Sequence, residues 1–154
     1  MKAVVDTTYL LHVVGISVEK LSTKFLEILQ STNRDLEVAI CEITLFELVA
    51  KAAKRVAFES LERERVLRGI ESLRRDDSIS KIEAYDYRVV STSLKLRPFL
   101  PDFIDCLILA SAIEYADILL TEDELIHDLK RKKEFKELLA ATNPSFKVQS
   151  ISDL

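Results

Sequence analysis

Short apolar runs of β type alternate with helical patterns along this chain of 154 residues. Such alternation is typical of an α/β fold, in which helices cover a mainly parallel sheet. The strands are expected at residues 2–5, 37–41, 78–83, 117–120 and 146–150. A chain of this length can bury one sizeable core, and no linker or internal repeat divides it. We therefore predict one α/β domain over residues 1–154.

Helices are expected between these strands, because apolar residues recur there every three or four positions. Their predicted ranges are 7–15, 18–31, 44–55, 59–75, 85–96, 102–116 and 122–140. The 18–31 segment is amphipathic, with one apolar face made by Leu21, Phe25, Ile28 and Leu29. Helices of this kind have the faces needed to cover a sheet.

Four acidic residues stand inside or next to the most apolar stretches of the sequence, namely Asp6, Glu47, Asp105 and Asp123. An ionised carboxylate is costly to bury unless it is paired, hydrogen-bonded or bound to a metal. No lysine or arginine lies within three residues of any of the four, so local ion pairs are not expected to neutralise them. One shared cation would satisfy the whole set. The sequence therefore predicts a metal site.

The predicted elements place these acids at one rim of the sheet. Asp6 ends the first strand and Asp123 follows the fourth, whereas Glu47 and Asp105 lie near the starts of helices. Ligands of open α/β sheets bind beyond the carboxyl ends of the strands, where the strand order reverses. All four positions are compatible with that location.

Capping of helices is the alternative explanation for two of the acids. Asp105 can be a first-turn acid behind Asp102 as the N-cap, and Asp123 can cap the helix that follows it. Glu47 lies within a helix and caps nothing. Glu122 and Glu124 are expected to face solvent.

Composition excludes several other kinds of site. The two glycines, Gly15 and Gly69, are too few for a Walker phosphate loop or a dinucleotide-binding fingerprint. The two histidines exclude a histidine-rich zinc site and are interpreted as surface or packing residues. Cys41 and Cys106 match no zinc-ligand spacing and are interpreted as buried free thiols.

The net charge of −4 gives the chain no overall attraction for nucleic acid, so any binding must come from local basic clusters. One cluster lies in residues 51–75 and includes Lys51, Lys54 and Arg55; a second spans residues 130–133. Solvated helix faces with internal ion pairs are the alternative reading of both. No apolar run is long enough for a membrane span and no signal-peptide core is present, so a cytoplasmic location is expected.

The four acidic motifs resemble those of the PIN-domain family of metal-dependent ribonucleases, especially the VapC-like toxins of toxin–antitoxin pairs. The matching segments are Val4-Val5-Asp6-Thr7-Thr8, Ile43-Thr44-Leu45-Phe46-Glu47-Leu48, Asp105-Cys106-Leu107-Ile108-Leu109-Ala110-Ser111-Ala112 and Leu119-Leu120-Thr121-Glu122-Asp123. They occur in the family's order and cover nearly the whole chain. One departure is that Glu124-Leu125-Ile126 replaces an aromatic residue that many members carry after the fourth acid.

The resemblance implies a three-layer α/β/α fold around a parallel sheet in the order 3-2-1-4-5. Asp6 and Asp123 would then face each other where the strand order reverses. It also implies Mg²⁺ or Mn²⁺ as cofactor, RNA as substrate, a possible small antitoxin as partner and a homodimer. The basic helices or the apolar face around Leu21–Leu29 would supply the dimer surface.

Within that implied site, Asp6 and Asp105 are interpreted as the main metal ligands. Glu47 would complete the site or orient the attacking water, and Asp123 would act through a water or a second ion. Thr8 and Thr121 are interpreted as hydroxyls that orient the carboxylates. Two alternatives stay open: a PIN-like module that binds RNA or protein without cleavage, and an RNA-processing nuclease outside a toxin–antitoxin system.

Overall fold

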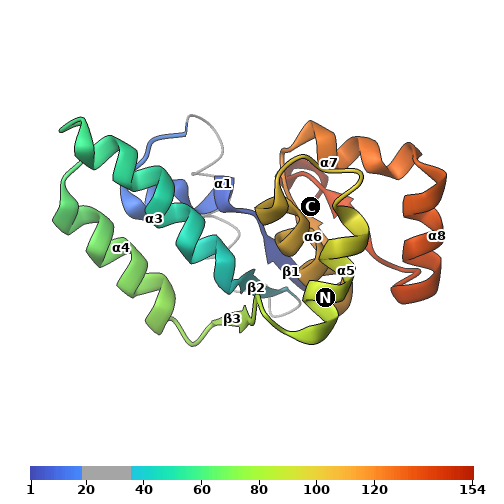
Figure 1. Cartoon of the computed structure of the whole chain (residues 1–154). Coiled ribbons are helices and arrows are strands. Elements are labelled where there is room, and N and C mark those ends of the chain that lie inside the picture. The colour runs from blue at the N-terminus through green and yellow to red at the C-terminus, as the bar shows by residue number, and fades with distance from the viewer. Residues whose placement is uncertain (19–35) are drawn as a thin grey trace.

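The computed structural model describes residues 1–18 and 36–154 and shows a five-stranded parallel sheet between layers of helices (Figure 1). The strand order is β3-β2-β1-β4-β5, so the predicted order and fold class are confirmed. The strands are β1 (Lys2–Val5), β2 (Glu37–Cys41), β3 (Ile79–Ile82), β4 (Ile118–Leu120) and β5 (Lys147–Gln149). Every neighbouring pair of these strands is parallel.

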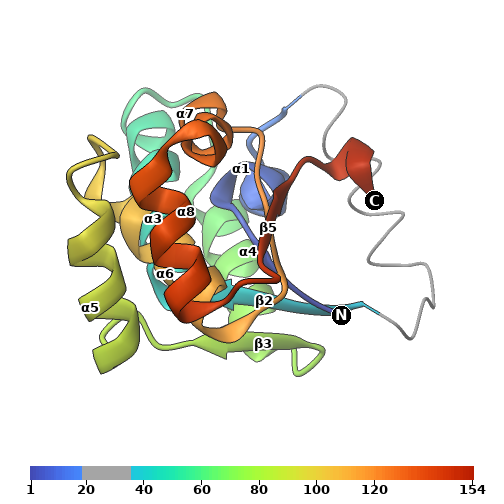
Figure 2. The same ribbon diagram turned by 90° about the vertical axis from the view of Figure 1, so that its right-hand side faces the viewer.

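After their first residues, the inner strands β1 and β2 are apolar and buried, as is all of β4, because both faces of the sheet are covered (Figure 2). The helices are α1 (Thr7–Leu10), η1 (Leu11–Val14), α3 (Glu42–Ala57), α4 (Arg63–Arg75), α5 (Tyr87–Leu96), α6 (Phe103–Tyr115), α7 (Glu124–Asp128), η2 (Leu129–Arg131), α8 (Lys133–Thr142) and η3 (Ile151–Asp153). Val4 and Leu119 point to a core shared with α5, α6 and α8, whereas Val5 and Leu120 point to a core shared with α1, α3 and α4. The alternation of side chains along each strand thus builds two cores.

The predicted helix at 59–75 is wrong at its start, since α4 begins only at Arg63. The preceding helix, α3, continues to Ala57 and closes with Glu59 in the left-handed conformation, at φ 54°. Ser60 N donates to Arg55 O and Glu59 N to Val56 O, both at 3.0 Å. This pattern is a Schellman motif, which usually has glycine at the left-handed position. Glutamate there removes the sequence signal for the helix end.

The predicted helix at 122–140 is also wrong, because α7, η2 and α8 replace one continuous helix. The chain is extended at Lys132, within the four basic residues 130–133. Leu129 and Phe135 are both fully buried. On a continuous helix, residues six apart point about 120° away from each other. The break therefore lets both side chains enter the core.

The segment after β1 is held by direct contact with α4. Gly69 lies so close to η1 that a Cβ atom there would stand 2.2 Å from Val13 O. Arg65 donates to Val13 O at 2.7 Å and to His12 O at 3.2 Å. Gly15, at φ 90°, ends η1 in the left-handed conformation. These contacts fix the position of the residues that follow Asp6.

Three smaller expectations can be compared with the structure. Cys41 and Cys106 are buried free thiols, as interpreted. The predicted helix at 18–31, with its Leu21–Leu29 face, lies outside the described residues apart from Val18. None of the helices in the described part of the chain combines the length and apolar character needed to cross a bilayer.

Candidate metal centre

Asp6 lies where the order of the strands reverses, between β1 and β4. Its backbone N–H donates to Leu120 O at 3.0 Å, which continues the β1–β4 pairing by one residue. Its Oδ1 accepts from Thr7 N and its Oδ2 from the Thr121 hydroxyl, each at 2.7 Å. The side chain is buried, with 9% of the residue exposed. The first residue of α1 and the residue after β4 therefore hold this carboxylate in one orientation.

Burial is the largest influence on Asp6 and raises the pKa of its carboxyl group. The negative charge of Glu47 raises it further, whereas the hydrogen bonds from Thr121 and Thr7 and the charge of Lys51 oppose the rise. The site thus stabilises an ionised Asp6 only in part. A nearby cation would add the missing stabilisation.

Glu47 comes from the second turn of α3 and reaches the same rim. Its side chain is 13% exposed, pairs with Lys51 at 2.7 Å and accepts a hydrogen bond from the Thr7 hydroxyl. The expectation that no local cation neutralises these acids is therefore wrong for Glu47. Residues four apart on a helix are neighbours, so a search limited to three residues misses Lys51.

Asp105 lies in the first turn of α6, directly behind the N-cap. The cap is Asp102, which accepts from Ile104 N at 2.8 Å, as predicted. No group in residues 1–18 or 36–154 donates a hydrogen bond to the half-buried Asp105 carboxylate. Burial raises its pKa to about 7, and four further carboxylates add to the rise, namely those of Asp102, Asp6, Asp123 and Glu47. The negative charges of Asp6, Glu47 and Asp123 therefore all act on the Asp105 carboxylate.

Asp123 acts as the N-cap of α7. Its Oδ1 accepts from Leu125 N at 2.7 Å and from Ile126 N at 3.4 Å. The capping interpretation of this residue therefore describes a real contact. Among the described residues, the hydrogen bonds to Asp123 all go to Oδ1, so capping leaves Oδ2 available to a ligand.

The two threonines expected to orient the carboxylates are placed differently. Thr121 contacts Asp6, accepts from Asp123 N at 3.1 Å and has its carbonyl 2.9 Å from His127 Nε2. At the other end of the site, the hydroxyl that reaches a carboxylate is that of Thr7, next to the predicted Thr8. Thr7 was missed although it directly follows Asp6. The role of Thr8 stays a prediction.

A second hydrogen-bonded group supports the loop after β4. The hydroxyl of the buried Tyr9 donates to Glu122, and Ile151 N donates to Tyr9 Oη at 3.0 Å and to Glu122 Oε1 at 3.2 Å. Burial and the bond to Glu122 raise the pKa of Tyr9. The expectation that Glu122 faces solvent is therefore wrong. Its carboxylate ties the loop between Thr121 and Asp123 to α1 and η3.

The four acids approach one another without forming a ready-made ligand set. Among the described residues, no three His, Cys, Asp or Glu side chains lie close enough together to hold an ion as they stand. Two of the four have other partners, since Glu47 pairs with Lys51 and Asp123 caps α7. The donors are all carboxylate oxygens, which suit Mg²⁺ or Mn²⁺ and not softer metals. The residues present therefore fit the implied cofactor.

The predicted RNA-binding residues lie along α3. Lys51 is 45% exposed and pairs with Glu47, while Lys54 and Arg55 are exposed near the end of the helix. In α4, Arg63 pairs with Glu64, and both Arg74 and Arg75 pair with Glu71. The alternative of a solvated helix face with internal ion pairs therefore describes α4. Within the basic cluster of residues 51–75, Lys51 is the residue that contacts the acidic site, through Glu47.

The model of the PIN domain family matches residues 3–132 of this chain. Among solved structures, the chain is similar to the crystal structure of VapBC2 from Rickettsia felis bound to a DNA fragment from their promoter. The TM-score is 0.62 with 18% identity, over 97% of this chain and 98% of the other. At that identity the likeness concerns the fold. No curated protein sequence matches the chain significantly.

Proposed function

The chain belongs to the PIN-domain family, and we propose that it is a Mg²⁺- or Mn²⁺-dependent endoribonuclease that acts as the toxin of a toxin–antitoxin pair. PIN domains are generally nucleases. The observation that carries the proposal is the convergence on Asp105 of three predicted acids from separate elements: Asp6, Glu47 and Asp123. Mutual repulsion among carboxylates destabilises the folded protein unless a cation binds between them.

Asp6 and Asp105 are the residues that we assign as direct ligands of the ion. Glu47 would join them by exchanging Lys51 for the ion, and Asp123 would contribute through Oδ2 or a bound water. When bound, the ion would polarise the phosphodiester group and lower the pKa of the attacking water. No protein nucleophile is assigned.

The chain's own residues then have defined tasks. Thr121 and Thr7 hold Asp6 in a fixed orientation through bonds of 2.7 Å. Lys51, once parted from Glu47, would be free to contact an RNA phosphate beside the reacting bond. Lys54 and Arg55 extend the positive charge along α3, so that the RNA backbone would run past the end of this helix.

Cleavage of RNA by the wild type and by Asp6→Asn, together with titration of Mn²⁺ by calorimetry, tests the proposal. Asp6→Asn is expected to lower both cleavage and Mn²⁺ binding by more than about 100-fold. Asp86→Asn is the matched control, because Asp86 caps α5 away from the site and asparagine caps equally well. Full cleavage by Asp6→Asn, or a wild type that binds no metal, would overturn the nuclease proposal.

The role as a toxin needs its own experiment. Induced expression should arrest growth, Asp6→Asn should relieve the arrest, and a small antitoxin encoded beside the gene should suppress it. We further propose a homodimer in the cytoplasm and treat residues 1–154 as one nuclease domain. Cleavage without growth arrest would favour an RNA-processing nuclease.

A non-cleaving RNA- or protein-binding module is the second candidate. It is favoured by the finding that the carboxylates of the described residues are not drawn into a ligand set. RNA binding that is unaffected by Mn²⁺ and never leads to cleavage would select this candidate.

A further inference from the structure

The outer edge of the sheet at β5 offers backbone groups for pairing. Within the described residues, β5 ends the strand order and has β4 as its neighbour. Lys147 N donates to Asp117 O and Gln149 O accepts from Thr121 N, each at 3.0 Å, so both residues turn their backbone towards β4. Alternate residues of a strand point their N–H and C=O groups to opposite sides. Val148, of which 3% is exposed, therefore directs its N–H and C=O away from β4.

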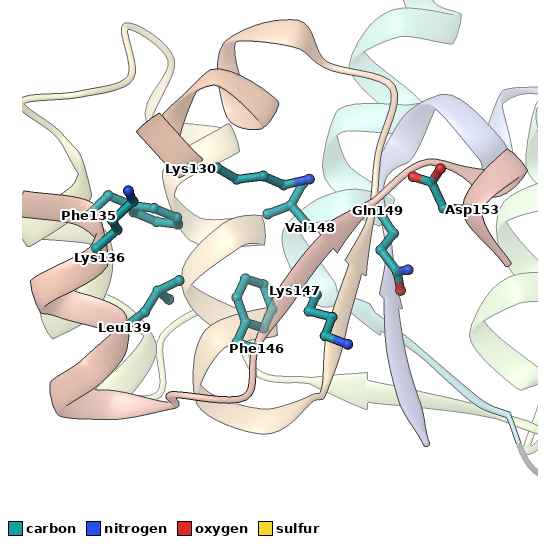
Figure 3. Close-up of a pocket in the computed structure, with 9 residues that line it drawn as sticks. All are labelled: Lys130, Phe135, Lys136, Leu139, Phe146, Lys147, Val148, Gln149 and Asp153. Carbon is teal, nitrogen blue, oxygen red and sulfur yellow. The ribbon is translucent and has the colours of Figure 1, made fainter. Parts of the chain in front are cut away.

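An apolar groove of about 390 Å³ lies beside this edge, between α8 and β5 (Figure 3). Its floor is formed by Phe135, Leu139, Phe146 and Val148. We call it the β5 groove. A strand added beside Val148 would alternate its side chains, so that every second one would enter this groove.

Positive charge surrounds the β5 groove although the chain as a whole is negative. Lys130, Lys136 and Lys147 line it, and Figure 3 shows them on separate segments around the apolar floor. Among the described residues, no carboxylate lies within 4.0 Å of the ammonium groups of Lys136 or Lys147. Asp153 is the acidic residue of the lining, and its carboxylate accepts from Ser150 N at 2.8 Å. The groove therefore has cationic groups to offer a ligand.

We propose that the β5 groove binds an extended, acidic segment of a protein partner, which joins the sheet as a strand beside β5. Val148 would exchange backbone hydrogen bonds with this segment, alternate apolar side chains would fill the groove, and acidic side chains would meet the lysines. The lysines favour a ligand with acidic side chains, and the backbone of Val148 favours a ligand in the extended conformation; an acidic strand has both properties. This inference is independent of the proposed nuclease function.

Two other occupants fit the groove less well. Single-stranded RNA needs exposed aromatic faces for stacking, but Phe135 and Phe146 are only 0% and 5% exposed. A second copy of β5 would bring lysine against lysine across the new pair, which is unfavourable. The lysines thus exclude self-pairing while they favour an acidic strand.

A fluorescent peptide of about eight alternating glutamate and valine residues is the probe, and its anisotropy is measured with increasing protein. Binding to the wild type is expected, with at least a tenfold weaker affinity for the double variant Lys136→Glu, Lys147→Glu. The matched control is Arg88→Glu, Lys95→Glu, which makes the same charge change at exposed positions of α5 and should bind as the wild type does. A peptide with lysine in place of glutamate should not bind.

Val148→Pro tests the backbone contact separately. It removes the outward N–H but leaves the bonds of Lys147 and Gln149 to β4, so peptide binding should be lost while thermal unfolding stays cooperative. If this variant does not fold, slowed hydrogen exchange of the Val148 amide in the peptide-bound wild type replaces it. No binding at about 1 mM protein, equal affinity for the lysine double variant, or displacement of the peptide by oligouridylate would overturn the proposal. A dimer of the wild type that Val148→Pro dissociates would do the same.

Discussion

Replacing Asp105 with asparagine is expected to stabilise the metal-free protein while it removes nuclease activity. In the structure, the Asp105 carboxylate is half-buried, receives no hydrogen bond from the described residues and feels four other carboxylates. Asparagine has nearly the same shape but carries no charge. The substitution should therefore relieve repulsion without creating a cavity.

The magnitude follows from the pKa of Asp105. One pH unit in pKa corresponds to about 1.4 kcal/mol. The difference between the ordinary value of 3.8 and about 7 in the folded protein corresponds to roughly 4 kcal/mol at high pH. Solvent screens the charge of a half-buried carboxylate, and the amide of asparagine is also costly to bury, so the observed gain should be about 1–3 kcal/mol.

The assay is urea denaturation of metal-free wild type and Asp105→Asn between pH 4 and pH 8. Because the folded-state pKa lies above the unfolded one, the folded wild type binds more protons in this range, and its stability falls as pH rises from about 4 to about 7. The advantage of Asp105→Asn should therefore be near zero at pH 4 and largest at pH 8. Mg²⁺ should stabilise the wild type more than the variant.

The competing explanation makes the opposite prediction. If Asp105 serves only as a first-turn acid of α6, Asp105→Asn should lose about 0.3–1 kcal/mol at pH 8. That outcome would refute the reasoning from repulsion. Asp77→Asn controls for the chemical change, since the exposed Asp77 side chain has no hydrogen bond or ion pair among the described residues and its replacement should shift stability by less than about 0.5 kcal/mol.

Three further predictions concern stability and are checked by chemical denaturation. Gly69→Ala should destabilise the protein by about 1–3 kcal/mol, although alanine favours helices, because its Cβ would meet Val13 O. An unchanged denaturation midpoint would contradict this close contact, and Ser72→Ala is the control on α4. Glu59→Gly should stabilise by about 1 kcal/mol, since glycine adopts the left-handed conformation without strain; Glu59→Ala keeps the Cβ and should not show this gain. Tyr9→Phe should lower the free energy of unfolding by about 1–3 kcal/mol and speed hydrogen exchange at the Ile151 amide, because it removes the hydroxyl that contacts both Glu122 and Ile151. Exchange at the wild-type rate would show that this hydroxyl is not needed.

The strand order could be predicted only through the resemblance to the PIN-domain family, whereas the placement of the acids at one rim of the sheet could be predicted from local patterns. Asp6 and Asp123 follow apolar strands, and parallel strands end at a common edge. Partners distant in sequence could not be predicted. Tyr9 and Glu122 are 113 residues apart, and nothing near either residue marks the contact. Lys51 could have been found, since position i+4 on a helix is always a neighbour.

Local signals failed where the chain departs from common residue preferences. Glu59 ends α3 in a conformation that glycine usually adopts, so the break before α4 has no sequence mark. At 129–135, the need to bury both Leu129 and Phe135 overrides a helical pattern. Tertiary packing decides both boundaries, which explains why periodicity alone placed them incorrectly.

The hydrogen bond between Thr121 and Asp6 joins residues that are 115 positions apart. During synthesis, β1 leaves the ribosome long before β4, although the two strands pair in the final sheet. Contacts of such long range also slow folding, because a large loop must close before they form. The carboxylate cluster should thus assemble late, after β4 has emerged. Until then, a nascent chain would carry Asp6 and Glu47 without a complete site.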